Sequence, residues 1–235
     1  MNNYYKIALE LQDIVTEIIG VIFGSKKNEL EIKVEDLNVL QRKNNSINSS
    51  TAIGYLIEEY VIVKLLNYFN SQQNKKEIKM NVKKVSNQNS YDFAIFAIVY
   101  KNHLFYINLK TYQKNNNAIA AIKKLYDDYV EYNGVFPLHF LIFKINYNIG
   151  LSSDNENIKI IINSTESYFL EEINFSEWHQ DKRSWSEAVD FNSGRLQVSN
   201  KFLKDHLLEI DNISYEKTKE QLALIYKLNR NKDTQ

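Results

Sequence analysis

An acidic residue, an amide and a lysine lie near the two ends of a predicted β-hairpin. Asp92 opens the first strand, and Asn108-Leu109-Lys110 closes the second, sixteen positions later. Side chains at i and i+2 of a strand point to the same face, so Asn108 and Lys110 project together. An antiparallel partner brings the start of the first strand beside the end of the second. We therefore expect Asp92, Asn108 and Lys110 to meet at one edge of a sheet.

Such a cluster supplies what hydrolysis of a phosphodiester requires. Carboxylate and amide oxygens are ligands for Mg²⁺, which polarises a phosphate and lowers the pKa of a bound water. A lysine can position or deprotonate that water and offset the charge that builds on the phosphate. The structural alternative is a sheet-edge ion pair between Asp92 and Lys110, which contributes little to stability.

The elements that must position these residues follow from the apolar pattern. Apolar side chains recur at helical spacing from Tyr5 to Phe23, and again from about Thr51 to Phe69. The runs Tyr91–Tyr100 and Leu104–Lys110 are nearly continuously apolar and β-prone, which predicts a hairpin with its turn at Asn102-His103. The lysine-rich run Ile78–Val85 is a weaker strand prediction.

The second half of the chain continues the alternation of helices and strands. The pattern predicts a helix, two strands and C-terminal helical segments, at Ala118–Tyr132, Leu138–Tyr147, Ile158–Ile162 and from about Lys201 to Leu228. Helices before, between and after the strands predict an α/β fold with a mixed β-sheet flanked by helices.

Composition narrows the classes of protein. The chain has 235 residues, of which 44% are hydrophobic, enough for a packed core. It has no cysteine, which excludes disulfides, thiolate-bound zinc and a cysteine nucleophile. No apolar run approaches the roughly 18–20 residues that span a bilayer, and the N-terminus lacks signal-peptide features. We therefore expect a cytoplasmic protein without a membrane partner. The balanced charge, 29 basic and 29 acidic residues, argues mildly against a protein that coats DNA.

Taken together, these residues and elements resemble the PD-(D/E)xK nuclease superfamily. Tyr91-Asp92 stands for its first motif half and Asn108-Leu109-Lys110 for its second. The segment 54–61 resembles its acidic helix, with Glu58 the closer match and Glu59 the alternative. The resemblance covers roughly residues 50–145 and extends more weakly to the C-terminus. It is greatest to type II restriction endonucleases of the HincII kind, in which a Lys-Thr pair also ends the motif strand, as Lys110-Thr111 does here.

Two positions depart from the family pattern. Tyr91 replaces a proline, which matters little. Asn108 replaces a carboxylate, which removes one metal-binding charge, although a minority of the superfamily carries Asn or Gln there and an amide oxygen is still a ligand for a hard cation. The alternative is that Asn108 is an inactivating substitution, and the sequence does not separate the two.

The resemblance implies a restriction-endonuclease-like fold and a Mg²⁺-dependent type II enzyme that cuts a palindromic double-stranded DNA site as a homodimer. Asp92, Asn108 and Glu58 would bind the metal, and Lys110 would orient or deprotonate the attacking water. A DNA methyltransferase is expected in the same restriction-modification system, but not as a stable partner. The alternatives are a repair or junction-resolving nuclease of the superfamily, or a non-catalytic DNA-binding or assembly protein with a nuclease-like fold.

Three polar segments are candidates for contact with DNA. Arg195 and Gln197 sit at i and i+2 of a short extended segment, and Arg–guanine and Gln–adenine are natural major-groove pairings. The family places groove contacts after the motif strand, and phosphate contacts are a further possibility near Trp178. The corresponding residues are Gln113, Lys114, Asn115 and Asn117 after the strand, and Lys182 and Arg183 beyond Trp178. Solvated polar loops are the structural alternative for all three.

No linker rich in Gly, Ser or Pro divides the chain, so we expect a single endonuclease domain over residues 1–235. Within it we predict an N-terminal helical region (1–48), a catalytic core (50–165), and a DNA-recognition loop with C-terminal helices (174–235).

Overall fold

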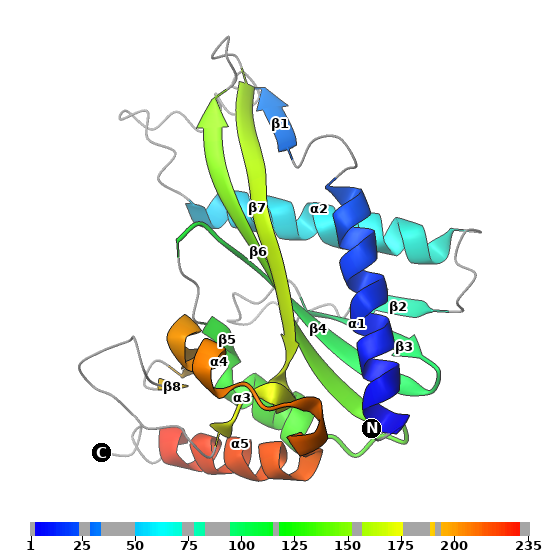
Figure 1. Ribbon diagram of the computed structural model, residues 1–235, viewed down its shortest axis with the longest axis vertical. Coiled ribbons are helices and arrows are strands. Elements are labelled where there is room, and N and C mark those ends of the chain that lie inside the picture. Colours follow the sequence, from blue (N-terminus) through cyan, green and yellow to red (C-terminus); the bar gives the residue numbers. More distant parts are fainter. Residues whose placement is uncertain are drawn as a thin grey trace.

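The computed structural model describes residues 3–23, 29–33, 50–71, 78–82, 95–114, 118–151, 157–175, 189–190 and 194–230 (Figure 1). Its centre is a six-stranded sheet in which β4 and β6 are parallel and the other neighbours antiparallel. The strands, in order across the sheet, are β1 (Glu29–Lys33), β7 (Asn157–Phe169), β6 (Leu138–Leu151), β4 (His103–Tyr112), β3 (Ile95–Tyr100) and β2 (Lys79–Val82). The prediction of a mixed α/β sheet flanked by helices is confirmed at this level.

Two long helices cover one face of the sheet. These are α1 (Asn3–Ile22) and α2 (Ser50–Asn70), drawn in dark blue and cyan in Figure 1. Their apolar side chains form one core cluster with the odd-numbered residues of β4 and β6, such as Phe105, Ile107 and Phe143. Side chains alternate along a strand, so the even-numbered residues of β4 and β6 face the other side.

The other face is covered by the second half of the chain. A second core cluster joins Tyr106, Phe140 and Ile142 of the sheet to this layer. The layer includes a small sheet ordered β5-β9-β8 and several helices. Its elements are β5 (Ala118–Ala121), α3 (Ile122–Leu125) continued by a π-helical turn (Tyr126–Val130), β8 (Val189–Asp190), β9 (Arg195–Val198), α4 (Asn200–His206) and α5 (Tyr215–Arg230).

The hairpin that carries the motif closes with a two-residue turn. Lys101 (φ 47°) and Asn102 (φ 62°) are both left-handed, and Tyr100 pairs with His103. Two residues with positive φ give the turn whose twist matches that of the flanking strands. The predicted hairpin is confirmed over its described residues, but its turn is Lys101-Asn102 rather than Asn102-His103. His103 is the first residue of β4, which extends to Tyr112 rather than ending at Lys110.

One secondary-structure expectation was wrong, and one strand was missed. Ala118–Ala121 forms strand β5 instead of the start of a helix, because pairing with β9 outweighs the helix propensity of three alanines. The strand β1, paired with β7, was not predicted at all. Its Glu and Lys residues alternate with two apolar ones, a short edge-strand pattern that is easily missed. Among the described residues, no helix is long and apolar enough to cross a membrane.

Candidate functional site

Asn108 and Lys110 lie on the same face of β4, as the spacing predicted. Ile107, which precedes Asn108, and Leu109, which lies between Asn108 and Lys110, belong to the core cluster with α1 and α2. Side chains alternate along a strand, so Asn108 and Lys110 face the opposite layer. Asn108 is fully buried and Lys110 is 9% exposed. Both side chains therefore lie beneath the layer that begins with β5.

The amide of Asn108 is held at one end and unsatisfied at the other. Its Nδ2 donates a hydrogen bond to the backbone carbonyl of Ile119 in β5. The β5–β9 pairing is irregular between Ala118 and Ala120, so Ile119 is the extra residue of a bulge, a feature that redirects backbone groups. Within the described residues, Oδ1 of Asn108 has no hydrogen-bond partner. A buried acceptor without a partner is costly, and a hard cation is one group that would satisfy it.

Glu58 of α2 lies at the end of the motif strand. Its Oε1 accepts hydrogen bonds from the backbone N–H and the hydroxyl of Thr111, both at 3.1 Å. Glu58 is 9% exposed, whereas Glu59 is exposed. Of the two acids left open by the sequence, Glu58 is therefore the one that contacts β4.

Gly54 allows α2 to lie close to Thr111 of β4. A Cβ on Gly54 would lie 2.6 Å from the hydroxyl oxygen of Thr111. One turn after Gly54 comes Glu58, so the same close approach brings its carboxylate to the strand. Burial first, and the nearby Glu58 carboxylate second, raise the pKa of Tyr147, which adjoins Gly54 from β6.

The Glu58 carboxylate occupies the β3 side of β4. Backbone N–H groups of successive strand residues point alternately to the two neighbouring strands. Leu104 donates to the carbonyl of Pro137, just before β6, so Thr111, of opposite parity, points its N–H toward β3. The described β3–β4 pairing ends at Ile95 and Asn108. Glu58 thus accepts a hydrogen bond from the backbone N–H of Thr111, three residues beyond Asn108.

Several predicted site residues fall outside the part of the chain that the structure describes. They are Asp92, Asn115, Asn117, Lys182 and Arg183. Among the residues that are described, no three His, Cys, Asp or Glu side chains gather into a metal-binding group. The described part of the predicted metal site consists of Glu58 and the Asn108 carbonyl oxygen.

Two of the predicted DNA-contacting residues, Arg195 and Gln197, lie on the small sheet. Gln197 of β9 is the register partner of Ala118, the first residue of β5, and Arg195 is exposed. The segment that joins β4 to β5 contains Gln113, whose carbonyl accepts a 3.4 Å hydrogen bond from Asn146, and the exposed Lys114. Ala118 and Gln197 lie 79 positions apart in sequence, and the β5–β9 pairing brings them together.

A second lysine beside Lys110 was missed. Lys144 of β6 is the register partner of Lys110, and Glu166 of β7 is the register partner of Lys144. Lys144 is 1% exposed, and burial lowers its pKa while Glu166 opposes this shift. The signal was present in the sequence, because Lys144 interrupts an apolar strand in the same way that Lys110 does.

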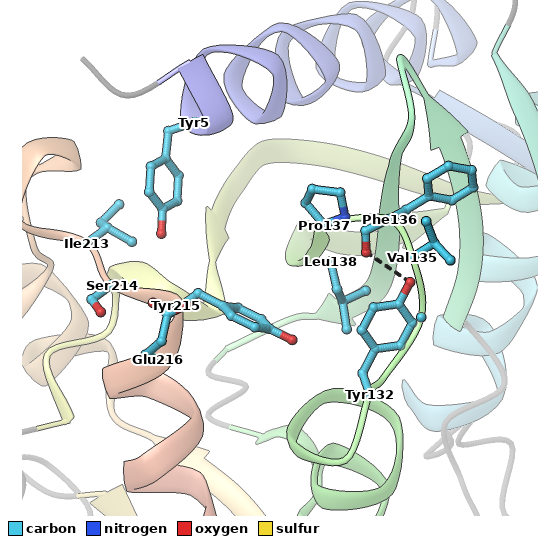
Figure 2. A pocket seen from close by; sticks show the side chains of 11 residues that line it. Tyr5, Tyr132, Val135, Phe136, Pro137, Leu138, Ile213, Ser214, Tyr215 and Glu216 are labelled. Carbon is cyan, nitrogen blue, oxygen red and sulfur yellow. Dashed lines mark hydrogen bonds between the residues drawn. The ribbon is translucent and has the colours of Figure 1, made fainter.

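A cavity of about 490 Å³ lies at the other end of β6 (Figure 2). Tyr5, Tyr132 and Tyr215 point into this region from three separate segments, and Tyr132 donates to the carbonyl of Phe136 at 3.0 Å. Leu138 also lines it, six residues before Lys144, which corresponds to about 20 Å along a strand. The cavity is therefore separate from the site at Asn108 and Lys110.

Comparison with models of known protein families gives no match, and comparison with curated proteins gives none either.

Proposed function

We propose that this chain is a Mg²⁺-dependent DNA endonuclease with a restriction-endonuclease-like fold, acting as a type II restriction enzyme. The observation that carries the proposal is the contact of Glu58 with Thr111. It brings an acidic helix residue to the end of the strand that bears Asn108 and Lys110, which is the arrangement expected from the sequence motif.

The described residues supply part of the ligand set that a magnesium ion requires. Glu58 supplies a carboxylate, and the buried Asn108 Oδ1, which lacks a partner among the described residues, supplies a neutral oxygen. Asp92 precedes Ile95 by three residues, so chain connectivity limits the separation of their Cα atoms to roughly 11 Å. Ile95 is paired with Asn108, so Asp92 is within reach of the same edge of the sheet.

The protein's own groups then have distinct tasks. Bound Mg²⁺ would polarise the scissile phosphate and lower the pKa of a coordinated water. The hydrogen bond from the Asn108 amino group to the Ile119 carbonyl fixes the orientation of the amide. The Asn108 carbonyl oxygen is then the end that would bind the metal. Lys110, on the same face and two residues on, would orient the attacking water and offset the charge that develops on the phosphate.

Recognition of double-stranded DNA is assigned to the small sheet. Arg195 and Gln197 of β9, together with Gln113 and Lys114 before β5, would contact the DNA. A palindromic site presents two equivalent phosphates, so a twofold homodimer would place one active site on each.

A second candidate is a DNA-binding protein that has lost cleavage. It is favoured by the neutral Asn108, whose amide is fully buried and already bonded to Ile119.

The variant Lys110→Ala separates the two candidates. If Lys110 acts mainly on the transition state, the variant should lose cleavage of plasmid DNA in Mg²⁺ while its DNA affinity, measured in EDTA, stays within about tenfold. The matched control is Lys101→Ala, because Lys101 lies at the other end of the hairpin and pairs with Glu10. Wild-type protein that binds DNA without cutting it would favour the second candidate, and retained cleavage by Lys110→Ala would remove Lys110 from the mechanism.

A further inference from the structure

A polar row crosses the second face of the sheet beside the candidate site. Lys110, Lys144 and Glu166 are consecutive register partners on β4, β6 and β7. Register partners point to the same face, with their Cβ atoms about 5 Å apart. The row holds two cations and one carboxylate, and Glu166 also accepts a 3.0 Å hydrogen bond from the hydroxyl of Tyr112.

The adjoining row contributes a buried hydroxyl. Tyr168 of β7 aligns with Ile142 of β6, which in turn aligns with Asn108. The Nζ of Lys144 lies 5.2 Å from the centre of the Tyr168 ring. Tyr168 is 5% exposed, and its hydroxyl has no hydrogen-bond partner among the described residues. A lysine and an unsatisfied hydroxyl donor therefore lie together, and Ile142 separates Tyr168 from Asn108 in the register.

The fold itself does not require these groups. The residues before Lys144 on the same face of β6 are Phe140 and Ile142, so an apolar residue would continue the packing. Like charges directly opposite one another in a sheet are destabilising, and burying a hydroxyl without a hydrogen-bond partner, as at Tyr168, costs free energy. Both costs fall when an anion binds between the two lysines.

We propose that Lys144 and the Tyr168 hydroxyl, together with Lys110, form a binding subsite for a phosphate group of the DNA. This inference rests on the proposed nuclease function and adds two residues to its site. All three side chains are at most 9% exposed, so a phosphate bound between them is held away from bulk water. Charge-assisted contacts are stronger in such surroundings.

The test measures binding of a labelled 30-base-pair duplex in EDTA at several salt concentrations. Loss of one phosphate contact should lower the slope of log affinity against log salt by about one. We expect this for Lys144→Met, with Lys144→Arg retaining the wild-type slope. Lys101→Met is the matched control and should keep the full slope. In Mg²⁺, Lys144→Met should also reduce the kcat/KM of cleavage roughly 100-fold.

Tyr168→Phe keeps the inference testable if Lys144→Met does not fold. It removes only the oxygen, so the variant should melt at the same or a higher temperature, while its duplex affinity falls about tenfold. Glu166→Gln removes the competing carboxylate and should tighten binding severalfold.

Two results would overturn the subsite. One is an unchanged duplex affinity in folded Tyr168→Phe, and the other is weaker binding by Glu166→Gln, which would identify Lys144 and Glu166 as a structural ion pair. Failure of the nuclease proposal is distinguishable, because wild-type protein would then cut no DNA even though the affinity differences persist.

Discussion

At the scale of single residues, the structure adds most to the sequence at Asn108. The sequence left open whether the amide is natural or inactivating. The structure shows a specific hydrogen-bond acceptor for the amide, because the carbonyl of Ile119, at the bulge in β5, accepts a hydrogen bond from Nδ2. A carboxylate has no proton to donate at neutral pH, so an aspartate would set two acceptors against each other.

Asn108→Asp should therefore destabilise the protein by about 1–3 kcal/mol, the usual consequence of leaving buried polar groups unsatisfied. Urea unfolding of the variant and of wild type measures this difference. Asn133→Asp, at an exposed position, is the control and should change stability little. A variant of unchanged stability that cuts DNA when wild type does not would identify Asn108 as an inactivating substitution instead.

Glu58 and Glu59 give a second contrast at this scale. Glu58→Gln keeps an acceptor for the N–H and hydroxyl of Thr111 but removes the charge, so stability should fall by less than about 1 kcal/mol while Mg²⁺-dependent cleavage falls roughly 100-fold. Glu59→Gln, at an exposed position on the same helix turn, should leave cleavage unchanged. Equal effects of the two variants on cleavage would count against Glu58 as a metal ligand.

At the scale of elements, the apolar pattern predicted the helices and the hairpin, because these elements have strong periodicity of their own. The start and end of α2 needed no long-range information, whereas the turn of the hairpin was predicted one residue too late. The position of β5 did need long-range information, since three alanines favour a helix until β9 pairs with them. Lys144 was missed for a similar reason, because its proximity to Lys110 follows from a parallel β4–β6 pairing that the sequence does not display.

Two glycines in the N-terminal helices should respond to alanine in opposite directions. Gly54→Ala places a Cβ 2.6 Å from the Thr111 hydroxyl, so either that hydroxyl must rotate away from Glu58 or α2 must shift from β4, and both stability and cleavage should decrease. Gly20→Ala meets nothing within 4 Å and should stabilise the protein by about 0.5–1 kcal/mol through helix propensity. Thermal melting measures both. An increase in stability for Gly54→Ala would show that the close contact of α2 with β4 is not required.

The short 3₁₀ turn that follows β7 contains a buried acid with a consequence for pH dependence. Burial raises the pKa of Glu171 to about 8, although the hydroxyl of Tyr129 donates to it at 2.8 Å. Its carboxyl is thus protonated more readily when folded than when unfolded, where a pKa near 4.5 applies. The stability it contributes is fully present below about pH 4.5 and is lost as the pH rises to about 8.

Glu171→Gln should remove that pH dependence. Between pH 5 and 8, the free energy of unfolding of the variant should therefore rise relative to that of wild type by up to about 1.4 kcal/mol for each pH unit. Urea unfolding at intervals over this range measures the difference. Glu216→Gln, at an exposed position, is the control and should run parallel to wild type. Parallel curves for Glu171→Gln and wild type would mean that Glu171 is ionised in the folded protein.

At the scale of the whole molecule, the described residues place α1 and α2 on one face of the sheet and the layer that contains β5, β9 and α5 on the other (Figure 1). Glu58 reaches the motif strand from the first face, while Asn108 and Lys110 face the second. The proposed site would therefore have to be assembled across the edge of the sheet. Residue spacing could predict that Asn108 and Lys110 share a face, but only the packing of α2 shows that Glu58 contacts Thr111 at the end of the same strand.

Assembly on DNA is predicted to be twofold. Sedimentation of the protein with a duplex that carries its recognition site should give a complex of two chains, because one active site is required for each strand of a palindrome. A stable complex of one chain with one duplex would contradict a symmetric type II enzyme.

The central proposal is tested most directly by incubating the wild-type protein with long DNA of known sequence and mapping the ends produced. With millimolar Mg²⁺ we predict discrete fragments whose ends share one short palindromic sequence, and no cleavage when EDTA replaces the metal. Intact DNA after incubation with folded protein and several long DNAs of different sequence would contradict the nuclease function.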